Sequence, residues 1–377
     1  MADKTEKRGL GQCSILVVGA GVLGLWQALL FARAGCRVTL IDRSKRPFAN
    51  AASAYAGAMI APDCEAEEAP NIVKACGARS ADLWRETLRA VEARGTLVVA
   101  APRDQSELRR FARATDGHRA VDADALASLE PDLAGRFRNA LYFENEAHMT
   151  TPTALAELLA HVKAAGCDVA LGVSWPPAAR DPDDQSFENT RATDLMGRPF
   201  DWTIDCRGIG ARDAMHGLRG VRGERLVLRA PGVTLKRPVR LLHPRQPIYV
   251  VPWSEDRYLV GATVIESDDA SPMTVRSALD LLGLAYALHP GFGEAEIVEL
   301  TAGIRPSFAD NVPRVIIDDA ERVVHVNGAY RHGFLLAPAM AEMTVAALTT
   351  AAPDGALVQR AGLHSAASAH PTGMRVA

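Results

Sequence analysis

Apolar and polar positions near the start of the chain follow the order strand, helix, strand. Residues 14–18 form a nearly unbroken apolar run, which predicts a parallel strand buried on both faces. A helix-like segment follows over residues 22–34, and Gly35 closes it. Residues 36–42 then form a second apolar strand that ends in Asp42. This order predicts a βαβ unit with two parallel strands.

The rest of the chain alternates between the same two patterns. Helices are predicted over residues 71–94, 151–165, 274–289 and 334–349, and strands over 96–100, 140–143, 200–206, 295–303, 322–326 and much of 222–264. Thr151-Pro152 is a typical helix start, and Gly166 stops that helix. Residues 176–199 carry acidic residues and helix breakers, so we predict a hairpin connection or a poorly ordered loop there.

The element order predicts a mixed α/β fold built from two interleaved domains. Segments of α/β type at both ends and in the middle form one domain, and antiparallel strands inserted between them form the other. We place the first domain at residues 10–90, 145–217 and 300–350, and the second at 91–144 and 218–299. Residues 351–377 are rich in Ala, Ser, Gly and Pro, which predicts a flexible tail.

The composition is that of a globular protein without strong charge. A chain of 377 residues with 48% hydrophobic content can bury a large core. The net charge of -3 gives no electrostatic reason to expect nucleic acid or an anionic membrane as a partner. Basic residues over 219–240 alternate with apolar ones, which indicates the solvated side of strands, with a partner surface as the alternative.

The six cysteines show no C-x-x-C or other metal-like spacing, so we expect neither a metal site nor a disulfide framework. A reducing cytoplasm fits this pattern. The first ten residues are charged and lack an apolar segment, so no signal peptide is expected. No apolar run reaches the length of a membrane span. We therefore predict a cytoplasmic protein.

A glycine turn joins the first strand to the first helix, in the sequence Gly19-Ala20-Gly21-Val22-Leu23-Gly24. Gly19 permits the tight turn, Gly21 lets a ligand approach the backbone, and Gly24 lets the helix pack closely on the strand. The free N–H groups of the helix start favour a pyrophosphate at this turn. Asp42 stands where a ribose hydroxyl acceptor belongs. The pattern predicts a dinucleotide, with a purely structural βαβ turn as the alternative.

Four predicted strand ends should meet at one place. Ligands of α/β sheets bind at the carboxyl ends of the strands, which here are Gly19, Asp42, Gly208 and Gly328. The turn at Gly328 leads into the last helix and supplies a second set of N–H groups for an electron-rich ring edge. A nicotinamide dehydrogenase is disfavoured, because the segment 328–338 would then have no cofactor to meet.

At these motifs the sequence resembles the glycine oxidase branch of the D-amino-acid-oxidase-like, FAD-dependent oxidoreductases, which includes the glycine oxidase of thiamine biosynthesis. The matching segments are residues 17–24, 53–62, 248–252 with 260–263, 303–306 and 328–338, and the last is the most diagnostic. The resemblance implies a Rossmann-like FAD-binding domain of the glutathione-reductase type, interleaved with an antiparallel-sheet substrate domain.

The resemblance also implies which residues hold a non-covalent FAD. The pyrophosphate would lie on Gly19, Gly21, Val22, Leu23 and Gly24, the adenosine ribose on Asp42 with Arg43, and the flavin against Ala51, Ala52, Ala56, Gly57 and Ala58 and, at its other edge, Gly328, Ala329, Tyr330, His332, Gly333, Phe334 and Leu335.

Four further residues would hold the substrate. The Arg305 guanidinium matches the fork of a carboxylate, Tyr249 would donate to the same carboxylate, and Arg331 would complete the pocket. Val264 stands where related enzymes carry methionine, so we expect it to set the pocket size. Structural ion pairs for the arginines and a core position for Tyr249 are the alternatives. His332 as a general base is disfavoured, because a histidine after a turn is often a hydrogen-bonded structural residue.

The activity implied by the resemblance is oxidative deamination of glycine or a similar small amino acid. Hydride transfer to the flavin would give an imine, then a 2-oxo acid, ammonia and hydrogen peroxide. This chemistry would require no acid or base side chain of the protein. The implied partners are the amino acid and oxygen, with thiazole synthase and a second copy of the chain as further ones. A sarcosine or D-amino-acid oxidase or dehydrogenase of the same fold is an alternative. A non-catalytic flavin-binding subunit is another, and the two arginines argue against it.

Overall fold

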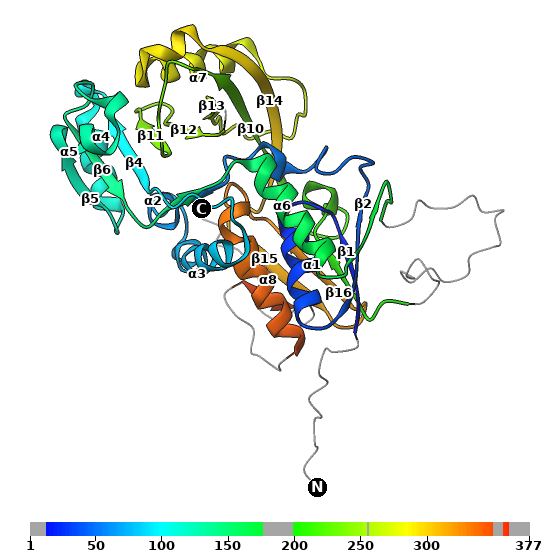
Figure 1. Ribbon diagram of the computed structural model, residues 1–377. Helices are drawn as coiled ribbons and strands as arrows, with labels where there is room; N and C mark the ends of the chain where they lie inside the picture. The colour runs from blue at the N-terminus through cyan, green and yellow to red at the C-terminus, as the bar shows by residue number, and fades with distance from the viewer. Residues whose placement is uncertain (1–12, 176–198, 255, 350–356, 362–377) are drawn as a thin grey trace, which may run out of the picture.

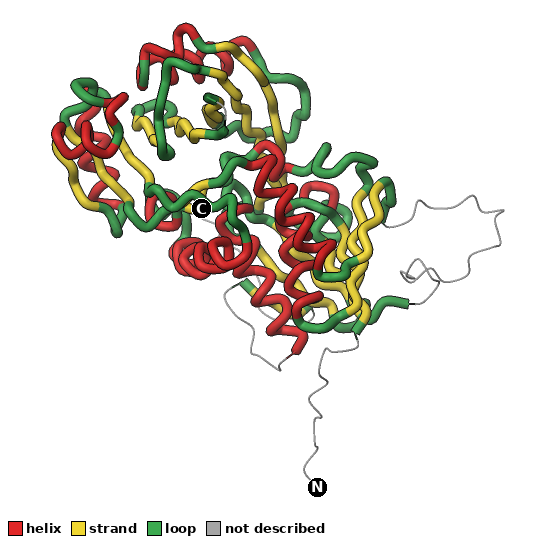
Figure 2. The backbone as a smooth tube through the Cα atoms, viewed as in Figure 1, coloured by secondary structure: helices red, strands yellow, loops and turns green. Residues whose placement is uncertain are grey.

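The computed structural model describes residues 13–175, 199–254, 256–349 and 357–361. Within these residues the chain forms two large sheets at opposite ends of the molecule, each flanked by helices (Figure 1). Figure 2 shows the strands of both sheets in yellow and the helices around them in red. The predicted mixed α/β class is confirmed.

The first sheet has seven strands and contains the predicted βαβ unit. Its strands in spatial order are β17 (Val358–Arg360), β15 (Arg314–Asp318), β16 (Val323–Asn327), β9 (Trp202–Asp205), β1 (Ser14–Val18), β2 (Arg37–Asp42) and β8 (Asp168–Leu171). The strands from β16 to β8 run parallel, and Val18 of β1 lies beside Ile41 of β2 and Asp205 of β9. The carboxyl ends of β1, β2, β9 and β16 therefore meet at one edge, as the sequence predicts.

Four helices pack at this sheet, namely α1 (Val22–Arg33), α3 (Asn71–Thr87), α6 (Thr151–Ala164) and α8 (Gly333–Thr349). α1 contacts α6 and α8, and α3 contacts α8. Trp26 of α1 meets Trp84 of α3 edge to face, with ring centroids 4.9 Å apart. Both indoles are completely buried, so these helices share one apolar core with β1, whose residues are all buried.

Helix α8 contains a proline, and another helix compensates for it. Pro338 has no N–H, so the carbonyl of Phe334, four residues earlier, lacks its helical partner. The indole N–H of Trp84 donates to that carbonyl at 2.7 Å, and the two rings stack with centroids 5.7 Å apart. This contact holds the start of α8 against α3.

The second sheet has eight strands. In spatial order they are β14 (Glu296–Ser307), β10 (Arg219–Arg229), β13 (Arg257–Gly261), β12 (Ile248–Pro252), β11 (Val239–Leu242), β4 (Thr96–Ala100), β6 (Asn139–Phe143) and β5 (Arg119–Asp122). All neighbours are antiparallel except β11 and β4. The helices at this sheet are α4 (Gln105–Ala114) and α5 (Ala123–Leu129) near β6, and α7 (Val275–Leu288) near β10.

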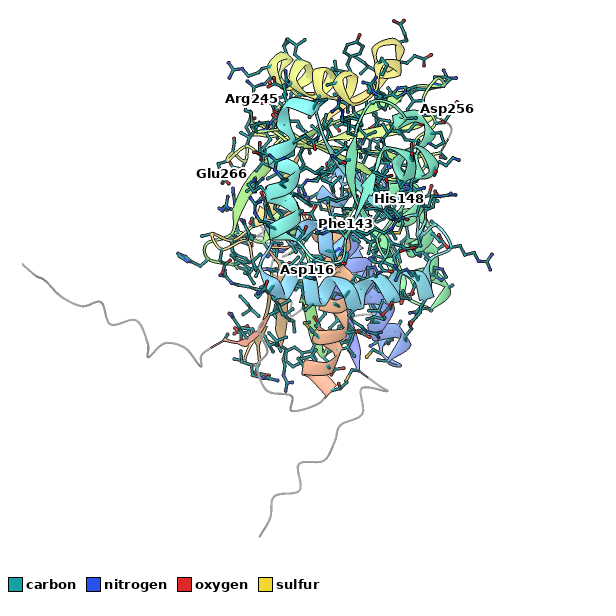
Figure 3. All side chains as sticks on the ribbon, turned by 90° about the vertical axis from the view of Figure 1, so that its left-hand side faces the viewer. Asp116, Phe143, His148, Arg245, Asp256 and Glu266 are labelled. Atoms are coloured by element: carbon teal, nitrogen blue, oxygen red, sulfur yellow. The ribbon has the colours of Figure 1, made fainter. Side chains whose placement is uncertain are left out.

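Short elements connect the two sheets. α2 (Pro62–Glu65) precedes α3, and β3 (Met59–Ile60) pairs with β7 (Ala147–His148). Figure 3 turns the β4–β6 end toward the viewer, with Phe143 and His148 between α3 and α7. Both side chains are almost completely buried.

One predicted helix end is wrong. The helix predicted over 71–94 ends at Thr87, because the next residue, Leu88, is extended and buried, and Glu92 then bridges to His148. The predicted division into two domains stays a prediction; its boundary between residues 299 and 300 lies within β14, which pairs with β10.

Six short strands, β3, β5, β7, β8, β15 and β17, are not predicted. β17 lies within the predicted flexible tail, where Leu357 and Val358 are buried and Val358 pairs with β15. Most of the loop predicted over 176–199 lies outside the described residues. Of the helices in the described residues, none is both long and apolar enough to cross a membrane. In the same part of the chain, no group of three His, Cys, Asp or Glu side chains could hold a metal ion.

Candidate active site

The glycine turn after β1 is built as the motif requires. Gly19 has a φ of +100°, and a Cβ there would lie 2.5 Å from the carbonyl oxygen of Cys206, the residue that follows β9. A Cβ on Gly24 would overlap the carbonyl oxygen of Gly19. A Cβ on Gly21 would make only ordinary contacts, with Ser53 Oγ at 3.6 Å and Ala51 Cβ at 3.9 Å. The fold itself therefore needs Gly19 and Gly24, whereas Gly21 leaves the helix start open to a ligand, which fits a pyrophosphate.

Asp42 lies at the end of β2, next to this turn. Its Oδ2 accepts a hydrogen bond from the Ala20 N–H at 2.7 Å, and its Oδ1 accepts one from the Ser44 N–H at 2.8 Å. Each carboxylate oxygen keeps a further lone pair, so these bonds leave room for ribose hydroxyls. Arg43, the other residue expected at the ribose, has an exposed side chain. The carboxylate thus has a structural task that the sequence did not predict, and its contact with a ribose stays a prediction.

The loop expected to line the flavin divides into two parts. A Cβ on Gly21 would be 3.9 Å from Ala51 Cβ, so Ala51 and its neighbour Ala52 lie near the glycine turn. The later part is fixed at the start of α6: Thr151 Oγ1 of α6 donates to the Ala56 carbonyl at 2.6 Å, and the N–H of Met149, just before α6, donates to the Ala58 carbonyl at 3.1 Å. Ala58 is buried with a positive φ of 49°, so the backbone here makes a sharp turn.

One cavity collects residues from four distant segments. It is lined by Ala56, Gly57, Ala58, Met59, Glu65, Tyr249, Arg331, His332, Phe334 and Leu335. Eight of these ten were predicted from the sequence as cofactor or substrate residues. Met59 and Glu65 were not. The expected flavin wall and two of the expected substrate residues therefore face the same space.

The turn before α8 closes one side of this site. Gly328 has a φ of +79°, and a Cβ there would overlap the ring of Phe308. The N–H of Tyr330 donates to the Pro306 carbonyl at 2.9 Å, which ties the turn to β14 beside Arg305. Burial raises the pKa of the Tyr330 hydroxyl. Ala329 is buried, and Gly333 begins α8, so its first turn faces the cavity through Phe334 and Leu335.

Arg305 is a cation without a carboxylate partner among the described residues. Its Nη1 donates to the carbonyls of Thr263 at 3.1 Å and of Arg222 at 3.4 Å. Burial lowers the pKa of its guanidinium, and the nearby Tyr249 acts in the opposite direction. The remaining N–H donors of the fork are left for another acceptor. A carboxylate is the acceptor that this geometry matches best.

Arg331 differs from Arg305, because two glutamates hold it. Its Nε lies 2.9 Å from Glu65 Oε2 and its Nη2 3.2 Å from Glu65 Oε1, while its Nη1 lies 2.8 Å from Glu68 Oε2. The expected substrate contact is thus already an ion pair at the cavity wall. His332 Nδ1 lies 3.5 Å from the same Glu65, and burial lowers the pKa of His332 to about 4. This histidine is neutral near pH 7.

Val264 does not line the cavity. Its side chain is 52% exposed, whereas the preceding residue, Thr263, is buried and offers its carbonyl to Arg305. The sequence analysis missed Glu65 and Glu68 altogether. A possible signal was the acidic run 65–68 directly after the flavin loop.

Comparisons with known proteins agree with this geometry. A model of the family described as FAD dependent oxidoreductase matches residues 14–347. The thiamine biosynthesis oxidoreductase assigned as ThiO in Rhizobium etli is 49% identical, over 87% of this chain and 94% of the relative. The bifunctional protein ThiO/ThiG of Nostoc sp. is 23% identical over 87% of this chain, which spans only 51% of that longer protein.

The crystal structure of glycine oxidase from Geobacillus kaustophilus has the same fold, with a TM-score of 0.70 over 89% of this chain and 94% of that one, at 20% identity. The predicted fold, enzyme class and cofactor, FAD, are confirmed by the family match together with this likeness. The match covers the second sheet, the first sheet apart from β17, and every residue that lines the cavity. The chain therefore belongs to the FAD dependent oxidoreductase family.

Proposed function

We propose that this protein oxidises glycine, or a similarly small amino acid, with oxygen as the final electron acceptor. The balanced reaction converts the amino acid, water and oxygen into a 2-oxo acid, ammonia and hydrogen peroxide. The carbon–nitrogen bond is oxidised to an imine, water hydrolyses the imine, and oxygen takes up the two electrons. A non-catalytic flavin-binding subunit is disfavoured, because such a protein has no use for a substrate clamp.

The single observation that carries this proposal is the state of Arg305. Its guanidinium is partly buried, is held by two backbone carbonyls and has no carboxylate partner in the described residues. A charge in that state is costly unless a ligand completes its hydrogen bonds. Tyr249, whose side chain lines the adjoining cavity, supports the same role for a carboxylate substrate.

We assign the FAD contacts to the residues of the glycine turn, Asp42, the loop 51–58 and the turn before α8. FAD, when bound, supplies the two-electron acceptor for the amine. The apolar side chains of Met59, Phe334 and Leu335 line the cavity, where they would exclude water from the bound substrate. The protein then has to position the amino acid, which the Arg305 clamp does, and no acid or base side chain is required.

A role in forming the thiazole of thiamine is supported by the Rhizobium etli relative. The Nostoc protein joins ThiO and ThiG in one chain, which supports a thiazole synthase as the enzyme that uses the product. The predicted cytoplasmic location and homo-oligomer stay predictions from the sequence.

Absorbance spectroscopy tests the proposal directly. We expect flavin bands in the purified protein, and we expect glycine added without oxygen to bleach them. Admission of oxygen should restore the bands and release hydrogen peroxide. A protein that cannot be reconstituted with FAD would contradict the proposal, and comparison of glycine with sarcosine and D-alanine ranks the substrates.

Arg305→Ala tests the clamp. The variant should bind acetate, a non-reactive carboxylate, about 100-fold more weakly and still retain FAD, since hydrogen bonds to a charged group contribute about 1.5–3 kcal/mol each. Arg245→Ala, which removes an exposed arginine paired with Asp280, is the control and should bind acetate normally. Equal loss of FAD and acetate in Arg305→Ala would show that Arg305 is structural.

A further inference from the structure

The two arginines near the cavity are in opposite states. Arg305 has no carboxylate partner in the described part of the chain, whereas Arg331 is gripped by Glu65 and Glu68. A protein that used both guanidiniums to bind anions would leave both unpaired. Arg331 lines the cavity, whereas Arg305 does not line it but interacts electrostatically with three of its lining residues, Tyr249, Arg331 and Glu65. The glutamates thus pair one of the two cations at this site.

Glu65 carries a negative charge in this wall. Burial alone would raise the pKa of its carboxyl, but Arg331, His332 and Arg240 together lower it to about 2. Glu65 lines the cavity, so its charge faces any bound molecule. Glu68 lies farther out, with 54% of its side chain exposed.

The surrounding charges leave no excess cation. Arg240 is almost completely buried, and its Nη2 lies 2.9 Å from Glu67 Oε2. Arg110 lies 2.7 Å from the other oxygen of Glu67. Glu107 lies 3.1 Å from the same Arg110. With Glu65 and Glu68 on Arg331, the cluster holds four carboxylates and three guanidiniums. A second anion entering the cavity would therefore find no free positive charge there.

We propose that Glu65 and Glu68 make the pocket selective for amino acids with a single carboxylate, by keeping Arg331 paired. One carboxylate is held by Arg305, and a second would have to displace a glutamate from Arg331 and approach the Glu65 anion. Repulsion between the second carboxylate and Glu65 would therefore disfavour binding of a dicarboxylate. This inference rests on the proposed function, since it assumes that Arg305 binds the first carboxylate.

Binding of non-oxidisable ligands to the FAD-loaded full chain tests the inference. Acetate carries one carboxylate and malonate carries two, and both are titrated through changes in the flavin spectrum. We expect the native protein to prefer acetate. Glu68→Gln frees part of Arg331 and should raise the affinity for malonate relative to acetate about tenfold. Glu68→Asp keeps the charge and should keep the native preference. If Glu68 were merely structural, Glu68→Gln and Glu68→Asp would not differ in this preference.

Two further variants complete the design. Glu65→Gln should change the same ratio in the same direction, and Glu68→Gln carries the test alone if the buried position 65 does not tolerate the change. Glu342→Gln removes an equal charge from the exposed pair between Arg79 of α3 and Glu342 of α8 and should leave the ratio unchanged. A malonate-to-acetate ratio within twofold of native in Glu68→Gln would overturn the proposal.

Failure of this inference is distinguishable from failure of the proposed function. If glycine bleaches the flavin and the ratio stays unchanged, only the selectivity proposal falls. If glycine has no effect but the ratio shifts, the proposed oxidation of glycine falls and the selectivity stands. If neither acetate nor malonate binds to the native protein, both proposals are wrong.

Discussion

The guanidinium of Arg305 lies directly over the backbone of Gly223 on the neighbouring strand. A Cβ at position 223 would overlap the guanidinium carbon and both terminal nitrogens. The strands β14 and β10 pair here, with Gly223 opposite Gly303 and Val221 opposite Arg305. The absence of a side chain at Gly223 therefore sets where the Arg305 guanidinium, the proposed carboxylate clamp, lies.

Gly223→Ala should displace the Arg305 fork while leaving the cofactor site intact. Because the methyl group occupies the position of the guanidinium, we expect KM for glycine to rise at least tenfold, with FAD content unchanged. Steady-state kinetics and the flavin absorbance measure the two quantities. Gly232→Ala, at a position where a Cβ meets nothing within 4 Å, is the matched control. A normal KM in Gly223→Ala would mean that Arg305 does not bind the substrate in this geometry.

Two glycines of the turn after β1 should respond differently to alanine. Gly24→Ala places a methyl group on the Gly19 carbonyl, so we expect the FAD-free protein to lose roughly 3 kcal/mol or more of unfolding free energy. The methyl group of Gly21→Ala makes only ordinary contacts, with Ser53 and Ala51, and the backbone at Gly21 is extended, so the FAD-free protein should lose about 1 kcal/mol or less.

The FAD affinity of Gly21→Ala should nevertheless fall at least tenfold, because its methyl group stands where the pyrophosphate approaches. Urea unfolding of the FAD-free variants and titration with FAD separate the two effects. Unchanged FAD affinity in Gly21→Ala would place the pyrophosphate elsewhere.

The contact between Trp84 and Phe334 is a further measurable feature. Trp84→Phe removes the indole N–H and leaves the Phe334 carbonyl, already without a helical partner because of Pro338, buried and unpaired. We expect a loss of about 2–4 kcal/mol in unfolding free energy, from the missing hydrogen bond and the smaller ring.

Trp26→Phe provides the comparison. Trp26 is equally buried, but its indole nitrogen has no hydrogen-bond partner in the described residues. Its replacement should therefore cost less than that of Trp84, since only packing is lost. If both variants lose the same stability in urea unfolding, the hydrogen bond to Phe334 contributes nothing.

The local parts of this fold could be predicted from the sequence. β1, α1 and β2 follow from unbroken apolar runs separated by glycines, and the shared edge of four strands follows from the rule on carboxyl ends. The short strands β8 and β17 could not be predicted, because each depends on pairing with a strand distant in sequence and carries too few buried residues to make a pattern.

The same distinction applies to the candidate site. Arg305 and Tyr249 could be proposed as substrate residues from their motifs, but the position of the Arg305 fork depends on Gly223 across the sheet. Arg331 could be placed at the cavity, yet its ion pair with Glu65 joins residues 266 positions apart. Nothing in the sequence near Arg331 or near Glu65 indicates that the two residues pair. Only the structure shows that Arg331 is paired.

The burial of His332 predicts that acid destabilises this protein. Burial lowers the pKa of its imidazole to about 4, against the opposing effect of Glu65, whereas an unfolded histidine has a pKa of about 6.5. The unfolded chain therefore binds the proton more strongly between these values, and the native state loses stability as the pH falls from 6.5 toward 4.

Between pH 7 and pH 5 this single group should remove about 2 kcal/mol of unfolding free energy. His332→Gln should lose correspondingly less over that interval, and urea unfolding at the two pH values measures the difference. His148 is also buried, and burial lowers its pKa to about 4. It therefore adds its own acid-induced loss of unfolding free energy, which is the same in the native protein and in His332→Gln and cancels in the comparison. The exposed His216→Gln is the control and should keep the native pH dependence. If His332→Gln also keeps it, the imidazole of His332 is as easily protonated in the folded chain as in the unfolded one, and the wall of the cavity is open to water.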